Sequence, residues 1–522
     1  MNRSCPSAKP EASSAKPEAS PSKPEASSSK PEASSSKPEA SSSKACTLIR
    51  DIAYEYNADD GLSYSSPARG VWNIVHIGTL VPGGHQIYVC PTSCLRGVVL
   101  TTAELGAMDR LSTITVGEDN ILEGDMEETL HEGVRKVIDS LPVRPRMMMV
   151  FTSCIHHFLA VNYQRIYRLL RKEYPDIDFI DCYMHPIMRR TSPPVPTLWR
   201  QMYRVLRPDG PDTGSIDNGS PDTGSPDTSG TSGGEKDPRQ VSILACEFPR
   251  DAYCDAVQHL KQHGIHIADV TGSKTYDEFL TMSRSSLNLL FHKAGMKAAK
   301  DLEIRLKQPY LMMRPGYVYE EIDADLAALS ERIGIPAPSA EETEKLRAAA
   351  EQAAADAAAV LKDTPVSVDG TAVDCPLGLC VYLLEHGFRV ETLFVDNFTE
   401  TEEVFMKLRS LKPDLKVYSA LNWNMRQKER GWQPEESCGA AGPDGAAGSG
   451  SPTGPGGAKI VAIGQRAAYF HDTNYFVDLV NNDGMYGYRG IVRLMELLTE
   501  AFREEKDMRR LIQIKGWGCS CG

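Results

Sequence analysis

The alternation of short apolar runs with amphipathic helical segments is the feature that most restricts how this chain folds. The run "RMMMVFT" at 146–152 is typical of a buried strand. A helical pattern follows it, and one face of that pattern carries Ile155, Phe158, Leu159, Asn162, Ile166 and Leu169. The runs "VSILAC" at 241–246 and "LNLLF" at 287–291 also lead into helical patterns. Strand–helix alternation of this kind predicts an α/β fold, in which Rossmann-like units have parallel sheets flanked by helices.

The length and the low-complexity segments predict how the chain divides into domains. At roughly 100–200 residues per domain, 522 residues correspond to about three domains. The proline-containing repeat "KPEASSS" has almost no apolar residues and is expected to be disordered, and Gly/Pro/Ser/Asp-rich stretches are expected to be flexible insertions. An Ala-rich segment is most simply a solvent-facing helix. The predicted order is a disordered repeat at 1–45, a first α/β domain at 46–207, an insertion at 208–238, a second α/β domain at 239–340, the Ala-rich helix at 341–362, and a third α/β domain at 363–522 with an insertion at 435–458.

The charge and hydropathy pattern exclude several classes of function. A formal net charge of −13 argues against a nucleic-acid-binding protein, which usually presents a basic face. There is no run of about 18 apolar residues, so we expect no membrane span. The N-terminal segment has no apolar core typical of a secretory signal, so we expect a cytoplasmic protein. In a reducing compartment the 13 cysteines are not expected to form a disulfide framework, which leaves metal binding, cluster binding or simple burial.

Cys90, Cys94 and Cys154 are the candidate metal-binding cysteines because they lie where ligands bind in parallel α/β sheets. Cys90 ends the apolar run "QIYV", Cys94 precedes a helical pattern, and Cys154 follows "RMMMVFT" directly. Ligands of such folds bind at the carboxyl ends of strands, and a helix N-terminus there stabilises a thiolate. The alternative is that each cysteine is a small buried apolar residue. A structural zinc site is a minor alternative, because no second close pair of cysteines or histidines accompanies "CPTSC".

Several common nucleotide and hydrolase motifs are absent from the sequence. No G-x-x-x-x-G-K-[ST] segment occurs, so we expect that this chain binds no nucleotide and hydrolyses no ATP. No G-x-G-x-x-G follows a strand, and neither G-x-S-x-G nor H-E-x-x-H occurs. Nicotinamide-dependent and hydrolytic functions are therefore unsupported.

Several segments resemble the nitrogenase component 1 family. The segment from "VWNIVHIGTLVPGGHQIYVCPTSCLRG" to "HEGVRKVI" is similar to the first domain of that family, and "VFTSCIHHFLAVNYQRI" resembles its second cluster segment. The segment "LNLLFHKAGMKAAKDLEIRLKQPYL" resembles the middle-domain strand and helix beside the active-site cofactor. The segment "YFVDLVNNDGMYGYRGIVRLMELL" is similar to the closing segment. The similarities keep the family's order over most of the chain.

The resemblance implies an iron–sulfur cluster, 4Fe-4S or larger, at an interface between two subunits. Cys154 matches the ligand in the second cluster segment. Cys90 and Cys94 fall slightly after the family's glycine-flanked ligand cysteine, whose column holds about Gly83–Gly84 here, so one or both replace that ligand. The family's earliest ligand has no counterpart. We therefore expect three ligands from this chain and others from an identical or homologous component 1 subunit.

The resemblance places His292 where nitrogenase has the cysteine that anchors its active-site cofactor. His292 and His471 are candidate catalytic residues at the substrate crevice, and the alternative for each is a hydrogen-bonded core histidine. Tyr486 and Arg489 are further candidates for the crevice, or else surface residues of a turn. The implied function is an iron–sulfur oxidoreductase subunit that receives electrons from an ATP-dependent, iron-protein-like reductase. The alternatives are a scaffold for cluster or cofactor assembly and a paralogue without a cluster.

Overall fold

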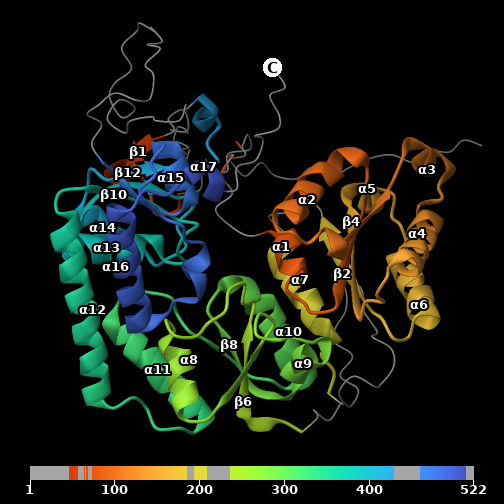
Figure 1. Cartoon of the computed structure of the whole chain (residues 1–522), viewed down its shortest axis with the longest axis horizontal. Helices are drawn as coiled ribbons and strands as arrows, with labels where there is room; N and C mark the ends of the chain where they lie inside the picture. Colours follow the sequence, from red (N-terminus) through yellow and green to blue (C-terminus); the bar gives the residue numbers. More distant parts are fainter. Residues whose placement is uncertain are drawn as a thin grey trace, which may run out of the picture. The chain divides into compact units, whose positions relative to one another are not determined.

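The described residues of the computed structural model form three sheets with helices around them (Figure 1). The described part of the chain is 46–56, 64, 66, 68, 73–184, 193–208, 235–427 and 459–512. The whole of the 1–45 repeat, most of the 208–238 insertion and the whole of the 435–458 insertion lie outside these residues, as do Cys5, Cys438, Cys519 and Cys521.

The first sheet is four-stranded and parallel, with strand order β3-β2-β4-β5. Its two central strands are buried along their whole length, which explains why their sequences are continuous apolar runs rather than alternating ones. Figure 1 shows α4 and α6 on one face and α1 and α7 on the other. The elements are α1 (Ile74–Gly78), β2 (Gly84–Cys90), α2 (Thr92–Glu104), β3 (Leu111–Thr115), α3 (Glu118–Glu123), α4 (Met126–Ser140), β4 (Met147–Ser153), α5 (Cys154–Phe158), α6 (Tyr163–Glu173), β5 (Asp178–Met184) and α7 (Pro194–Met202).

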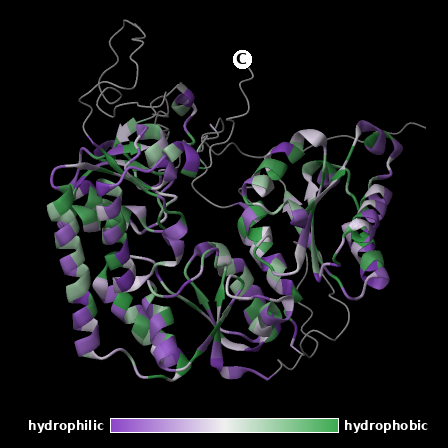
Figure 2. Ribbon diagram, in the orientation of Figure 1, coloured by the Kyte–Doolittle hydropathy of each residue, from purple (hydrophilic) through white to green (hydrophobic). Residues whose placement is uncertain are grey.

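The second sheet is also four-stranded and parallel, with strand order β7-β6-β8-β9. In Figure 2 its central strands are hydrophobic, while purple, hydrophilic residues lie along the outer faces of the helices. The elements are β6 (Asp237–Leu244), α8 (Asp255–Gln262), β7 (His266–Asp269), α9 (Tyr276–Leu280), β8 (Ser285–Leu290), α10 (Met296–Leu306), β9 (Tyr310–Met312) and α11 (Tyr319–Ile333).

The third sheet is six-stranded, with strand order β1-β12-β11-β10-β13-β14. All its neighbouring pairs are parallel except β1 and β12. The elements are β1 (Cys46–Leu48), α12 (Ala340–Leu361), β10 (Pro365–Asp369), α13 (Pro376–Glu385), β11 (Arg389–Phe394), α14 (Glu402–Leu411), β12 (Lys416–Tyr418), β13 (Val461–Ile463), α15 (Gln465–His471), β14 (Phe476–Val477), α16 (Gly487–Arg503) and α17 (Met508–Leu511).

These sheets confirm the predicted α/β class, but three local expectations differ from the structure. Residue 46 was expected to begin the first domain, yet β1 pairs with β12 in the third sheet. The Ala-rich helix is not simply solvent-facing, because Ala350, Ala354 and Ala357 are buried where α12 packs on α16. Small side chains at this spacing let two helices approach closely.

The helical face expected after β4 is not continuous. Ala160 adopts a left-handed conformation with φ 51°, which separates α5 from α6. Asn162 caps the new helix by accepting a hydrogen bond from the backbone N–H of Arg165. As a result the buried face of α6 is Ile166, Tyr167 and Leu170, and Phe158 and Leu159 are exposed.

Candidate functional site

Cys90 and Cys154 lie at the same edge of the first sheet. Cys90 is the last residue of β2, and Cys154 begins α5 directly after β4. The two strands are adjacent and parallel, with Val89 opposite Thr152, so both chains reach this edge together. Cys94 lies in the first turn of α2, where its backbone N–H donates to the carbonyl of Pro91. The topology therefore brings the three predicted cysteines to one edge of one sheet.

The three thiols differ in their surroundings. Cys90 is buried, Cys94 is exposed and Cys154 is partly buried. Burial, together with the nearby Cys94 thiol, raises the pKa of Cys90 to about 12. A thiolate at Cys90 therefore needs a nearby positive charge, which a bound metal ion supplies.

The other cysteines of the described residues have different surroundings. The thiol of Cys246 donates to the carbonyl of Phe248 at 2.8 Å, and that of Cys375 donates to the carbonyl of Pro315 at 2.6 Å. Cys182, Cys254 and Cys380 are buried and free. Cys46 is disulfide-bonded, and this one bond does not amount to the disulfide framework that the sequence argues against. None of the contacts that hold these side chains points to a metal.

The three candidate cysteines do not close a metal site by themselves. Among the residues that the structure describes, no group of three or more His, Cys, Asp or Glu side chains is arranged to hold a metal ion. The donors at this edge are all thiols, which suits an iron–sulfur cluster. The residues present therefore fit one side of a cluster site, and further ligands would have to come from elsewhere.

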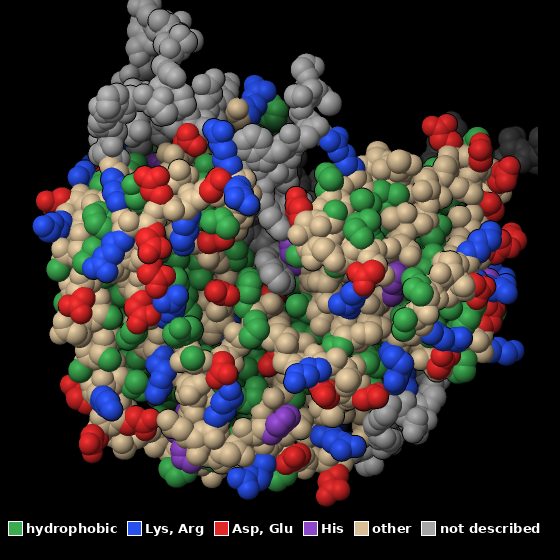
Figure 3. All heavy atoms as spheres, viewed as in Figure 1, with side chains coloured by type: hydrophobic (Ala, Val, Ile, Leu, Met, Phe, Trp, Pro, Cys, Tyr) green, Lys and Arg blue, Asp and Glu red, His purple; other side chains and the backbone are tan. Residues whose placement is uncertain are grey.

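Exposed apolar side chains surround this edge of the first sheet. Phe158 is 69% exposed and Leu159 44%, and both follow Cys154 within five residues. Leu122, on α3, is 84% exposed. A shallow hollow beside them is lined by Ile121, Leu159 and Leu169, with Asp125 and Arg165 among its polar residues. Hydrophobic side chains reach the surface of the first unit in Figure 3 as well. Exposed large apolar side chains such as Leu122 and Phe158 are a feature of protein–protein contacts.

His292 lies at the carboxyl end of β8, and both of its ring nitrogens are engaged. Nδ1 accepts a hydrogen bond from the backbone N–H of Ala294 at 3.0 Å, so Nδ1 carries no proton. Nε2 then carries the proton, and it faces Asp374 Oδ1 at 3.3 Å. Burial raises the pKa of Asp374, and the neighbouring His292 and Arg250 oppose that rise. Binding a metal through either nitrogen would require His292 to give up one of these contacts.

His471 is buried within the third unit. Its Nε2 lies 3.1 Å from Ser367 Oγ and 3.1 Å from Thr392 Oγ1, which belong to β10 and β11. Burial lowers the pKa of His471 to about 4, so the ring is neutral. These surroundings are those of a hydrogen-bonded core histidine.

Tyr486 and Arg489 connect the second and third units. Tyr486 is not a surface residue as expected: its side chain is buried, and its hydroxyl donates to Asp325 Oδ2 at 3.3 Å. Arg489 forms an ion pair with the buried Asp255 at 2.5 Å. Both contacts have a structural role at the start of α16.

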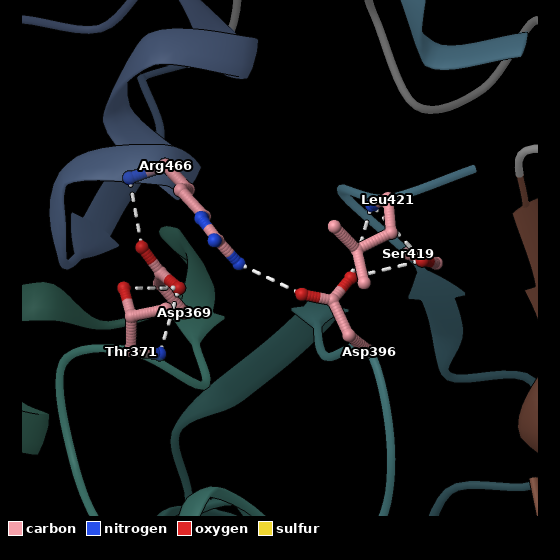
Figure 4. Close-up of polar contacts among 6 residues, drawn as sticks. All are labelled: Asp369, Thr371, Asp396, Ser419, Leu421 and Arg466. Carbon is pink, nitrogen blue, oxygen red and sulfur yellow. Dashed lines mark hydrogen bonds and ion pairs between the residues drawn. The ribbon is translucent and has the colours of Figure 1, made fainter. Parts of the chain in front are cut away.

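The carboxyl edge of the third sheet is closed by a network of hydrogen bonds and an ion pair (Figure 4). Asp369, at the end of β10, accepts from the backbone and hydroxyl of Thr371 and from the backbone N–H of Arg466 at 2.7–2.9 Å. The Arg466 guanidinium pairs with Asp396 at 2.9 Å, and Asp396 also accepts from Ser419 and Leu421. Gly464 has φ 98°, and a Cβ there would lie only 2.7 Å from that of Asp369.

A sequence model of the nitrogenase component 1 type oxidoreductases matches residues 77–503. The chain belongs to the nitrogenase component 1 family. Among solved structures it is similar to "Nitrogenase Cp1 at pH 6.5", with a TM-score of 0.56 and 15% identity, covering 87% of this chain and 95% of that one. It is also similar to "Nitrogenase Cp1 at pH 5", with a TM-score of 0.51 and 11% identity, covering 88% of this chain and 93% of that one. No curated protein sequence matches.

Membership of the nitrogenase component 1 family agrees with the chemistry of the first sheet's edge. Proteins of this family bind iron–sulfur clusters, typically form oligomers and work with an iron protein. All five candidate site residues lie inside the matched range, 77–503. No helix in the described parts of the chain has the length and apolar character needed to cross a membrane.

Two polar groups of this family member were not identified from the sequence. One is the Asp369–Arg466–Asp396 network, whose residues come from three separate segments. The other surrounds Asp181, a carboxylate inside the strand "DFIDCYM". An acidic residue in the middle of a mostly apolar strand was the only signal for it.

Proposed function

We propose that this chain is an iron–sulfur oxidoreductase subunit that receives electrons from an ATP-dependent, iron-protein-like reductase. The observation that supports the proposal is that Cys90, Cys94 and Cys154 all lie at the same edge of the first sheet. A cluster bound there would store electrons and pass them on. These electrons would reduce a substrate whose identity is unknown.

Each of the three cysteines has a distinct part in this proposal. Cys90 would supply a buried thiolate, whose high pKa makes its ionisation depend on the metal. Cys94 is in the first turn of α2 and is exposed, so it would supply a thiol that a partner can reach. Cys154, at the end of β4, would complete the face that this chain contributes.

A second subunit would complete the site. Three thiols from one chain leave positions for further ligands, and the exposed Leu122, Phe158 and Leu159 give a second copy or a homologue an apolar surface to pack against. ATP would be hydrolysed by the reductase partner, in agreement with the absence of a phosphate-binding loop motif in this sequence.

Metal analysis of the anaerobically purified protein tests the proposal. We expect stoichiometric iron and sulfide, and an electron paramagnetic resonance signal after reduction with dithionite. Cys90→Ala, Cys94→Ala and Cys154→Ala should each lower the iron content. Cys182→Ala is the matched control, because Cys182 is a cysteine of the same sheet. The Cys182→Ala protein should bind as much iron as the native protein. If all three variants keep the iron of the native protein, the cluster assignment is wrong.

A scaffold for cluster or metallocofactor assembly is the second candidate. His292 favours it, because both ring nitrogens are engaged at the place where the resemblance puts the cofactor-anchoring cysteine. A scaffold would transfer radiolabelled iron to an apo acceptor protein and show no reductase-dependent substrate reduction. Turnover that requires the reductase, without transfer of iron, would instead support the oxidoreductase.

A further inference from the structure

Three arginines surround a single carboxylate where α7 packs against α10. Oδ2 of Asp301, on α10, accepts from Nε of Arg305 at 2.6 Å. Its Oδ1 lies 3.3 Å from Nε of Arg200, on α7, and 3.9 Å from Nε of Arg204, in the short helical turn after α7. The side chain of Asp301 is only 11% exposed. One carboxylate thus faces three guanidinium groups at a partly buried position.

The three guanidinium groups differ in how many of their donors are paired. The terminal nitrogens of Arg305 donate to two backbone carbonyls of the segment after α7, both at 3.1 Å. Arg200 donates one hydrogen bond, from Nε to Asp301. Arg204 donates none to any residue that the structure describes, and its ion pair with Asp301 is the longest of the three. Donors in the interior of native proteins are almost always paired, so the open donors of Arg200 and Arg204 point to an acceptor from outside the chain.

Burial makes the charge of Arg204 costly unless an anion approaches it. The Arg204 side chain is 15% exposed, and burial lowers its pKa. Asp301 and Asp181 oppose this lowering of the pKa. The positive charges of Arg200 and Arg305 add to it. Neither Arg200 nor Arg204 has a partnerless nitrogen that is sealed from solvent, so an ion from solution can reach their open donors.

The local charge balance favours an anion with two negative charges. Three guanidinium groups around one carboxylate leave two positive charges in excess, in a chain whose net charge is −13. The next carboxylate, Asp181, accepts from Tyr183 and has Arg171 beside it, so it does not remove this excess. Arg200 and Arg204 lie one helical turn apart, where like charges repel. Planar guanidinium groups bind the oxygens of phosphate through paired hydrogen bonds, so an oxyanion is the ligand that fits two neighbouring arginines.

We propose that Arg200 and Arg204 bind a doubly charged oxyanion of the phosphate class, as the free ion or as a phosphate ester. Asp301 and Arg305 hold the two arginines in place and are not ligands of the anion. Because the two arginines belong to the first unit and Asp301 to the second, the bound anion strengthens the packing of α7 on α10 by removing the repulsion between them. This inference is independent of the proposed function, because it uses none of the candidate cysteines or histidines.

Binding of inorganic phosphate to the metal-free full chain tests this inference. Isothermal titration calorimetry should show one site, and phosphate should raise the unfolding temperature more than sodium chloride of the same ionic strength does. Arg200→Gln and Arg204→Gln should each weaken phosphate binding by at least about tenfold, because each removes charge-assisted hydrogen bonds. Arg135→Gln is the matched control. It removes an exposed arginine of the first unit that pairs with Glu173, and it should bind phosphate as the native protein does.

Stability without phosphate distinguishes a binding role of Arg204 from a structural one. Arg204→Gln removes a charge that the neighbouring arginines repel, so in phosphate-free buffer it should unfold at or above the native temperature. Arg204→Lys keeps the charge but loses the planar group, so it should fold as the native protein does and bind phosphate more weakly. Lower unfolding temperatures for both variants would show that Arg204 is structural and would overturn the inference.

A comparison with glycerol phosphate identifies the source of the oxyanion. Tighter binding of glycerol phosphate than of inorganic phosphate supports a phosphorylated small molecule as the ligand, and the reverse order supports the free ion. The inference is wrong if phosphate stabilises the native protein no more than chloride does. It is also wrong if Arg200→Gln and Arg204→Gln both bind phosphate as tightly as the native protein.

Discussion

The carboxyl edges of the first and third sheets have the same architecture but opposite chemistry. At the third sheet, Asp369, Arg466 and Asp396 pair with one another and with backbone groups, so the edge is closed. At the first sheet, the buried Cys90 and the exposed Cys94 lie near exposed apolar side chains, and both thiols are free. Parallel α/β sheets all offer a ligand position at this edge. At the third sheet the polar groups of this edge already satisfy one another, whereas at the first sheet the cysteines are free.

The largest expected effect on stability comes from removing the Arg466 side chain at the edge of the third sheet. Arg466→Ala leaves Asp396 partly buried without its ion pair and should reduce the free energy of unfolding by about 3–5 kcal/mol. Urea denaturation measures the change. Arg389→Ala, which removes a more exposed ion pair with Glu391 in the same unit, is the control and should cost roughly 0–1 kcal/mol. Equal effects of the two variants would contradict the contrast between the edges.

His471 should make the third unit sensitive to acid. Its folded-state pKa is lowered to about 4 from 6.5, so the unfolded chain binds more protons between these values. The neutral ring therefore contributes about 3 kcal/mol to the free energy of unfolding above pH 6.5, and this contribution is lost as the pH falls toward 4. The difference in unfolding free energy between the native protein and His471→Gln should narrow over that range. A difference independent of pH would show that the buried ring is not neutral.

Asp181 should show the opposite dependence in the first unit. Its folded-state pKa is raised to about 6 from 3.8, so the native state binds more protons and its stability falls as the pH rises through this range. Asp181→Asn should therefore become more stable than the native protein by about 2–3 kcal/mol above pH 7, and lose this advantage below pH 4. Thermal unfolding of the metal-free proteins across this pH range measures it. If the difference in stability between Asp181→Asn and the native protein does not change with pH, the pKa of Asp181 is not raised.

The smallest effect on stability should occur at the open edge itself. Cys94 is exposed, so Cys94→Ala should change the unfolding free energy of the metal-free protein by less than about 0.5 kcal/mol. The same substitution should still reduce bound iron. A large loss of stability without loss of iron would mean that this edge is structural, as the third sheet's edge is.

Much of the fold follows from local sequence patterns. The continuous apolar run before Cys154 predicts a buried central strand, and β4 is one. The helix after it could not be placed correctly, because the turn at Ala160 exposes Phe158, which the helical period had assigned to the buried face. Periodicity predicts which residues share a face only while the helix continues. One residue in a left-handed conformation ends the helix, and the residues before and after it then no longer share a face.

The sequence by itself determined the α/β class, the family and the position of Cys90 and Cys154 at strand ends, because strand order and strand ends are encoded by neighbouring residues. Only the tertiary structure decided that β1 joins the third sheet and that Arg466 closes that sheet's edge. It also decided that Asp181 faces the phenols of α6. These contacts join segments far apart in the chain. Their energies depend on burial and on charges that no local pattern records.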